Sequence, residues 1–186
     1  MTPDKVDRDR GPDGRPRNDR PRDALGRPLA YGSPDVPRLA EGIRRAPQET
    51  IDEAQALCDA GRPFHAHEVF EDAWKLSPPA ERDLWKGLAQ LAVGLTHLAR
   101  GNPRGASTLL RRAGTALRRC EPGTFDLDLE GLIAWCDNVS PELRSGTDAL
   151  GTRADHPAAR PPVPAAPRFQ LVRPSRRSSS APDPQR

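Results

Sequence analysis

A stripe of leucines at helical spacing is the feature that most constrains the fold of this chain. Residues 79–100 carry leucines at intervals of three and four, the period that brings side chains to one face of an α-helix. The stripe consists of Leu84, Leu88, Leu91, Leu95 and Leu98. Trp85, Ala89 and Ala92 widen it. A helix this apolar is typical of a central element that is covered on several sides.

Prolines and glycines divide the rest of the central region into further helices. A proline suits the first turn of a helix, and a glycine suits the position after its last turn. On this basis we expect helices over about 47–60, 63–76, 79–100, 103–119 and 128–137. Short connections make consecutive helices antiparallel neighbours, and the sequence shows no β alternation. The predicted fold is all-α, a compact antiparallel helical bundle of about five helices.

The two ends of the chain have a composition that disfavours folding. Of the 22 prolines, seven lie in residues 1–37 and eight in residues 151–186. Segments rich in Pro, Arg, Asp and Ser bury too little apolar surface to offset the entropy lost on ordering. We therefore expect a disordered or extended N-terminal arm over 1–37, a bundle domain over 38–150, and a disordered tail over 151–186. Within the arm, residues 20–29 are either a plain linker or a segment that docks on the domain.

The net charge of +3 comes from the C-terminal tail. Residues 38–150 hold fourteen basic and seventeen acidic side chains, whereas residues 151–186 hold seven and two. This distribution is weak evidence for a nucleic-acid partner. The three cysteines are widely spaced, which indicates neither a disulfide framework nor a thiolate zinc site. The sequence shows no apolar run suited to a secretion signal or a membrane span, so we expect a cytoplasmic protein with no membrane partner.

The helix over 63–76 carries polar side chains on the face that its aromatic residues mark as apolar. In projection Phe64, Phe70 and Trp74 define that face, and His67 and Glu71 fall among them. The projection turns three other side chains away from this face: His65, Asp72 and Lys75. Because a buried carboxylate is costly without a partner, we expect another helix to supply one to Glu71.

The helix over 79–100 offers such a partner on the side away from its leucines. Gln90 and His97 lie there, beside Gly87 and Gly94. A glycine inside a helix costs about 1 kcal/mol relative to alanine, so two in register indicate that another helix approaches closely. We expect the helix over 63–76 to pack over these glycines. The candidate pocket then comprises His67, Glu68, Glu71, Trp74, Gln90 and His97.

Three interpretations of this pocket stay open. It is a buried hydrogen-bond network that fixes helix register, or the site of a non-catalytic interaction or small-ligand-binding module. Alternatively it serves a metal-dependent enzyme, such as a hydrolase, with His67, Glu71 and His97 as ligands of a divalent transition metal. We do not favour the metal, because clusters of polar groups also arise for structural reasons. The spacing of residues 65–68 differs from the HExxH motif, so no metalloprotease is implied. No individual catalytic residue is predicted.

The helix over 103–119 carries arginines that recur every seven residues, namely Arg104, Arg111 and Arg118. Such a row can bind phosphates, which makes a weak nucleic-acid binder the second alternative. A solvated face explains the arginines equally well, and no aromatic residue interleaves with them for base stacking. We therefore do not favour nucleic acid. A protein partner, a small ligand and a second copy of the chain all stay open.

Three sequence blocks carry a resemblance to a known family. They are DAGRPFHAHEVFEDAW at 59–74, WKGLAQLA at 85–92, and HLARGN at 97–102, followed by GA and LL. In order and spacing they resemble the bacterial and archaeal domain-of-unknown-function family numbered 309, over about residues 50–120. The resemblance implies a small all-helical bundle and brings no established activity. It places motif residues at His67, Glu68, Glu71, Trp74, Gly87, Gln90, Gly101 and Asn102.

Overall fold

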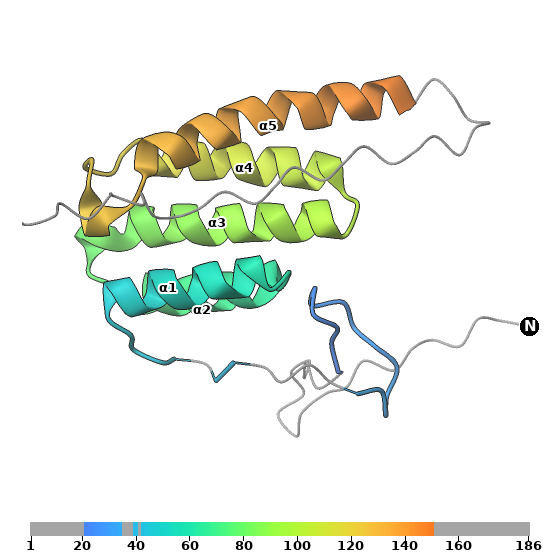
Figure 1. Ribbon diagram of the computed structural model, residues 1–186, viewed down its shortest axis with the longest axis horizontal. Coiled ribbons are helices and arrows are strands. Elements are labelled where there is room, and N and C mark those ends of the chain that lie inside the picture. The colour runs from blue at the N-terminus through green and yellow to red at the C-terminus, as the bar shows by residue number, and fades with distance from the viewer. Residues whose placement is uncertain (1–20, 35–38, 41, 151–186) are drawn as a thin grey trace, which may run out of the picture.

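The computed structural model describes residues 21–34, 39–40 and 42–150, and its elements there are helices. They are α1 (Pro47–Asp59), α2 (Pro63–Leu76), α3 (Arg82–Ala99), α4 (Pro103–Leu117) and α5 (Leu129–Leu150), with short 3-10 turns η1 (Pro79–Glu81) and η2 (Thr124–Asp126) (Figure 1). The predicted all-α bundle of about five helices is confirmed. The predicted tail over 151–186 and residues 1–20 of the predicted arm lie outside the described residues.

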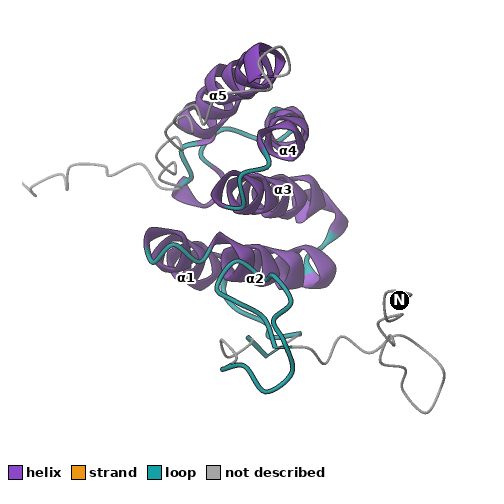
Figure 2. Ribbon diagram, turned by 90° about the vertical axis from the view of Figure 1, so that its right-hand side faces the viewer, coloured by secondary structure: helices purple, strands orange, loops and turns teal. Residues whose placement is uncertain are grey.

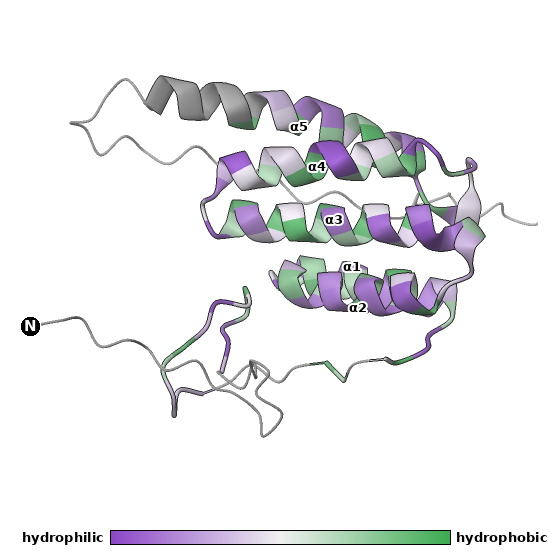
Figure 3. Ribbon diagram, turned by 180° about the vertical axis from the view of Figure 1, so that it is seen from behind, coloured by the Kyte–Doolittle hydropathy of each residue, from purple (hydrophilic) through white to green (hydrophobic). Residues whose placement is uncertain are grey.

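Helix α3 is the middle element of the bundle. It packs against α2 on one side and α4 on the other, while α1 covers α2 and α5 covers α4 (Figure 2). All members of its leucine stripe are at most 6% exposed. Each helix alternates between hydrophilic and hydrophobic residues, as amphipathic helices around a shared core must (Figure 3). No helix in the described part of the chain is both long and apolar enough to cross a membrane.

The glycines of α3 face α4, and the predicted packing of α2 over them is wrong. A Cβ atom added to Gly87 would lie 2.9 Å from Cδ2 of Leu117, and one added to Gly94 would lie 2.6 Å from Cδ2 of Leu110. Both leucines belong to α4 and are fully buried. The close approach was inferred correctly from the two glycines, but its partner is the helix that follows α3 and not the one before it.

Helix α5 extends well beyond Asp137, where the sequence predicted its end. Pro141 lies inside it and lacks the N–H that would bond to the carbonyl four residues earlier. Neighbouring carbonyls are satisfied by hydroxyls. Ser140 donates to the carbonyl of Cys136 at 2.7 Å, and Ser107 of α4 donates to the carbonyl of Ser140 at 2.8 Å. The packing of α5 on α4 thus allows α5 to continue past Pro141, although a proline usually ends a helix.

A turn in the N-terminal segment packs against one end of α2 and α3. Its bend is held by the carboxylate of Asp23, which accepts from the backbone N–H of Leu25 at 3.0 Å and of Arg27 at 2.7 Å. Gly26, at φ +73°, lies so close to the ring of Phe64 that an added Cβ would be 2.5 Å from it. The guanidinium of Arg100 donates to the carbonyl of Leu25. Of the two alternatives for residues 20–29, the described part therefore shows docking.

We predict opposite effects for two buried glycines of the α3–α4 pair. Gly94→Ala should lower the free energy of unfolding by about 1–3 kcal/mol, because the new methyl group overlaps Leu110. Gly114→Ala is the matched control. Its Cβ would meet its nearest neighbours at 3.5 Å, an ordinary contact. Since alanine favours the helix over glycine, this change should be neutral or add up to about 1 kcal/mol. Urea denaturation of both variants measures the difference, and equal losses would contradict the packing described.

Candidate functional site

The face that α2 turns inward differs from the predicted one. Its buried stripe consists of Ala66, Val69 and Phe70. Phe64 and Trp74, which defined the predicted face, are only half-buried. His65 and Asp72, expected to point outward, are 3% and 7% exposed. The prediction failed because it weighted the large aromatic side chains, whereas the small side chains mark where the neighbouring backbone comes close.

Asp72 is buried because the segment before α1 folds over it. Its carboxylate accepts from the backbone N–H of Gly42 at 2.9 Å and of Ile43 at 3.3 Å. The guanidinium of Arg45 lies 3.6 Å from it and also pairs with Glu53 of α1. These contacts fasten the entering chain to α2 and α1. We assign Asp72 a structural role that the sequence did not indicate.

His67 and Glu71 lie together on α2, but the carboxylate is not enclosed. Their Nε2 and Oε2 atoms are 3.9 Å apart, and the two side chains are 24% and 36% exposed. The near partner of Glu71 is Lys75, whose Nζ lies 3.1 Å from Oε1. Lys75 was expected to point away. The predicted demand for a partner from α3 is therefore wrong, because a lysine one helical turn along α2 meets it.

The two ring nitrogens of His67 have different surroundings: Nε2 lies 3.9 Å from Oε2 of Glu71, and Nδ1 is shut away from the solvent. Nδ1 is buried and makes no hydrogen bond within the described residues. The ring lies beside that of Phe64, with centroids 6.1 Å apart. Burial lowers the pKa of His67 from its ordinary value of 6.5, and the nearby Glu71 carboxylate only partly offsets this. The net effect favours a neutral imidazole in the folded protein at pH 7.

His97 lies in the last turn of α3, next to the connection to α4. Its Nδ1 accepts from the side-chain amide of Asn102 at 2.9 Å, and Asn102 Oδ1 accepts from the backbone N–H of Gly105 at 2.9 Å. Asn102 is the N-cap of α4, and His97 holds the amide in the capping orientation. Burial, followed by the nearby Arg100, lowers the pKa of His97. The expectation that His97 faces His67 and Glu71 is wrong.

Gln90 lies on the α4 side of α3. It lines a hollow of about 410 Å³ with seven other residues, and we call this the α3–α4 hollow. The full lining is Asp83, Lys86, Gln90, Arg111, Arg112, Thr115, Ala116 and Arg119. The Oε1 atom of Gln90 is buried and makes no hydrogen bond within the described residues. No hydrogen bond or ion pair in this part of the chain joins Gln90 to His67 or Glu71.

The two remaining members of the predicted pocket, Glu68 and Trp74, lie on α2. Both are half-buried. Trp74 packs against the edge of the core, and its carbonyl accepts from the hydroxyl of Ser77 at 3.2 Å. The six predicted residues thus divide into a group on α2, His97 in the last turn of α3, and Gln90 in the α3–α4 hollow.

The structure does not bring the proposed metal ligands together. His67 and Glu71 are adjacent, but His97 is engaged by Asn102. Among the described residues, no group of three or more His, Cys, Asp or Glu side chains is placed to hold a metal ion. The thiols are also unsuited to ligation, because burial, reinforced by a neighbouring aspartate, raises the pKa of Cys58 and of Cys136 to about 12.

The three arginines of the weak nucleic-acid hypothesis have different surroundings. All are exposed. Arg118 pairs with Asp137 of α5. Arg111 lines the α3–α4 hollow, while Arg104 does not. They therefore do not form one surface, and Arg112 and Arg119 are the residues that join Arg111 in the hollow. The sequence did not indicate this grouping because it did not show that α3 packs on α4, which places Lys86 and Gln90 beside these arginines.

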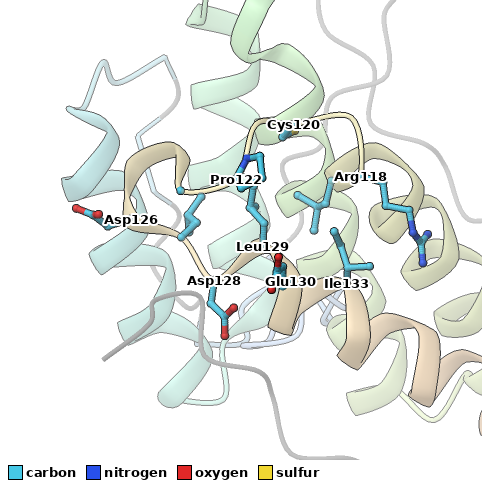
Figure 4. A pocket seen from close by; sticks show the side chains of 11 residues that line it. Arg118, Cys120, Pro122, Asp126, Asp128, Leu129, Glu130 and Ile133 are labelled. Carbon is cyan, nitrogen blue, oxygen red and sulfur yellow. The ribbon is translucent and has the colours of Figure 1, made fainter. Parts of the chain in front are cut away.

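A second hollow of about 350 Å³ lies under the loop between α4 and α5 (Figure 4). Cys120, Leu129 and Ile133 contribute to its lining, and Asp126 points away from the other labelled side chains. Phe125 and Asp126 have positive φ values of 54° and 57°, a strained conformation stabilised by stacking of Phe125 on Trp85 at 5.6 Å. None of the described buried polar atoms that lack a hydrogen bond lies in this lining. We assign no function to it.

Comparison with known proteins agrees with the sequence blocks. Residues 51–109 match the family model described as "Domain of unknown function (DUF309)". The resemblance to that family is confirmed. The matched segment contains α2, α3 and all six residues of the predicted pocket, but it ends before Arg111. The part of the α3–α4 hollow that α4 contributes therefore lies beyond the DUF309 match.

Two relatives were found among curated proteins. "Uncharacterized protein YpuF" of Bacillus subtilis (strain 168) is 38% identical over 68 residues, which are 36% of this chain and 39% of that protein. An "Uncharacterized protein" of Aquifex aeolicus (strain VF5) is 28% identical over 105 residues, which are 56% of this chain and 31% of that protein. The chain thus spans less than half the length of either relative. No solved structure matches.

The lowered pKa of His67 predicts acid sensitivity. Because the folded pKa lies below the ordinary 6.5, the unfolded chain takes up this proton at higher pH than the folded chain. The contribution of His67 to the free energy of unfolding is therefore constant above pH 6.5, and the protein becomes less stable as the pH drops below that value. Urea denaturation across this range should show a smaller fall for His67→Gln than for the unchanged protein. The pKa of His97 is lowered too, so His97 also contributes to the loss of stability in acid. A variant of His97 therefore provides the comparison for His67→Gln. Identical pH profiles for His67→Gln and the unchanged protein would contradict the burial of the ring.

Proposed function

We propose that the described domain is a non-catalytic module that binds a small polar ligand, with Gln90 among its binding groups. The observation that supports this is the state of the Gln90 side chain on α3. Its Oε1 atom is buried and makes no hydrogen bond within the described residues, and the residue lines the α3–α4 hollow. A buried polar atom left in this way costs about 1–3 kcal/mol, so its retention favours a role outside the fold.

The buried hydroxyls of the described interior are hydrogen-bonded. Those of Thr50, Thr96 and Ser107 each donate to a backbone carbonyl at 2.8–3.0 Å. The buried side-chain atoms without a hydrogen bond in the described part of the chain belong to Arg62, His65, His67, Glu68 and Gln90. Of these residues, Gln90 lines the α3–α4 hollow.

Binding is favoured over turnover by the chemistry of the available groups. His67 has one carboxylate nearby, and the separation of 3.9 Å is too long for a hydrogen bond. The buried thiols of Cys58 and Cys136 stay protonated at neutral pH, because their pKa values are raised to about 12. These features supply recognition of polar atoms, but no activated nucleophile.

Stability measurements separate this proposal from a structural hydrogen-bond network. Gln90→Leu replaces the amide by an apolar group of similar size, and the fold leaves that amide without a hydrogen bond. We expect the free energy of unfolding to stay level or to rise by up to about 1 kcal/mol. Ser107→Ala is the control, since its hydroxyl joins α4 to α5, and it should lower stability by about 1–2 kcal/mol. Chemical denaturation compares the two variants.

The binding part of the proposal is tested by native mass spectrometry. The unchanged chain, incubated with a small-molecule extract of cells, should retain a bound mass that Gln90→Leu loses. If Gln90→Leu instead destabilises the protein as much as Ser107→Ala and no bound mass appears, the amide serves the fold and the proposal is wrong.

A further inference from the structure

We infer that the ligand carries phosphate groups and is held in the α3–α4 hollow by Lys86, Arg111 and Arg112. This inference rests on the proposed function, since Gln90 belongs to the same hollow, and it adds the chemical class of the ligand. The hollow combines an uncompensated positive charge, a polar group left without a hydrogen bond and a volume suited to a small molecule.

The charge in the hollow is strongly one-sided. Four of its residues are cationic, and Asp83 is the single carboxylate among them. Asp83 lies 3.7 Å from Arg119, and both side chains are about half exposed or more, at 48% and 65%. Such an exposed pair is weak. The other three cations, Lys86, Arg111 and Arg112, make no ion pair or side-chain hydrogen bond within the described residues.

The arrangement of these cations suits a ligand with more than one anionic group. Arg111 lies on α4 and Arg119 lies just beyond its C-terminal end, so the two guanidinium groups start from different points along the hollow. Lys86 approaches from α3, so cations stand on both walls of the hollow. A guanidinium group can donate two parallel hydrogen bonds to two oxygens of one phosphate, and a lysine ammonium adds a compact positive charge. An anion here would also relieve the mutual repulsion of Arg111 and Arg112.

Gln90 and Thr115 add uncharged polar groups to the same lining. The Oε1 atom of Gln90 is buried and lacks a donor, and a turn of the amide toward the hollow would let a ligand hydroxyl supply one. Thr115 donates its hydroxyl proton to the carbonyl of Arg111 at 2.9 Å, which leaves its oxygen as an acceptor. A phosphorylated ligand that also bears hydroxyl groups therefore matches the lining better than a bare inorganic ion.

The size and composition of the hollow favour a small molecule over a nucleic-acid strand. Its volume of about 410 Å³ falls within the usual range for small-ligand sites. None of its lining residues is aromatic, so the bases of a strand would have no stacking surface. Arg104 and Arg118, which would extend the contact along α4, lie outside the lining. Recognition therefore depends on the phosphate groups.

The inference is tested by calorimetric titration of inorganic pyrophosphate into the full chain at low salt. The double variant Arg111→Ala/Arg112→Ala should weaken binding roughly tenfold or more. The control is Arg104→Ala/Arg118→Ala, which removes the same formal charge outside the hollow and should change affinity little, although it also removes the ion pair of Arg118 with Asp137. Asp83→Asn removes the single carboxylate and should tighten binding by roughly threefold. That gain cannot come from a variant that fails to fold.

Two results would overturn the inference. One is an equal loss of affinity in both double variants, because binding would then follow the overall charge of the chain. The other is the absence of pyrophosphate binding to the unchanged protein. If that absence comes with a bound mass that Gln90→Leu loses, only the phosphate class is wrong and the proposed function stands. If pyrophosphate binds as expected but Gln90→Leu destabilises the fold, the anion site stands and the role proposed for Gln90 fails.

Discussion

The close approach of α3 and α4 at Gly87 and Gly94 is the constraint on which the rest of the structure depends. The side chains of Leu117 and Leu110 occupy the space that a Cβ atom would need at the two glycines. Because α3 is central, fixing α4 on this side leaves the other side to α2. Helix α4 in turn carries α5, which continues through Pro141 with the help of Ser107. The order of the layers thus follows from where two glycines lie on one helix.

The same contact determines where polar side chains meet. Lys86 and Gln90 lie next to the glycines on α3, so the arrival of α4 places them beside Arg111 and Arg112. His67 and Glu71 remain on α2, where Lys75 and the solvent satisfy the carboxylate. A set of residues that looks like one cluster along the sequence is therefore divided between two sides of α3. The side chain of Gln90, whose Oε1 atom makes no hydrogen bond within the described residues and which lines the α3–α4 hollow, connects this arrangement to the proposed binding.

The sequence predicted the helices well because their signals are local. The prolines at 47, 63 and 103 mark the starts of three helices as the structure has them, and the leucine stripe identified the buried face of α3. Which helix meets which face is not a local property. The glycines showed that something packs on α3, but nothing local distinguished α2 from α4. Asp72 shows the same limit, since the segment that buries it lies about thirty residues earlier.

A double-mutant cycle between Gly94 and Leu110 tests the central contact most directly. If the side chain of Leu110 fills the space beside Gly94, Leu110→Ala makes room for a methyl group there. Gly94→Ala should then cost much less in the Leu110→Ala background than alone, with a coupling free energy of about 1 kcal/mol or more in urea denaturation. Additive losses, within about 0.5 kcal/mol, would mean that the two residues do not touch and would contradict the packing of α4 on the glycines of α3.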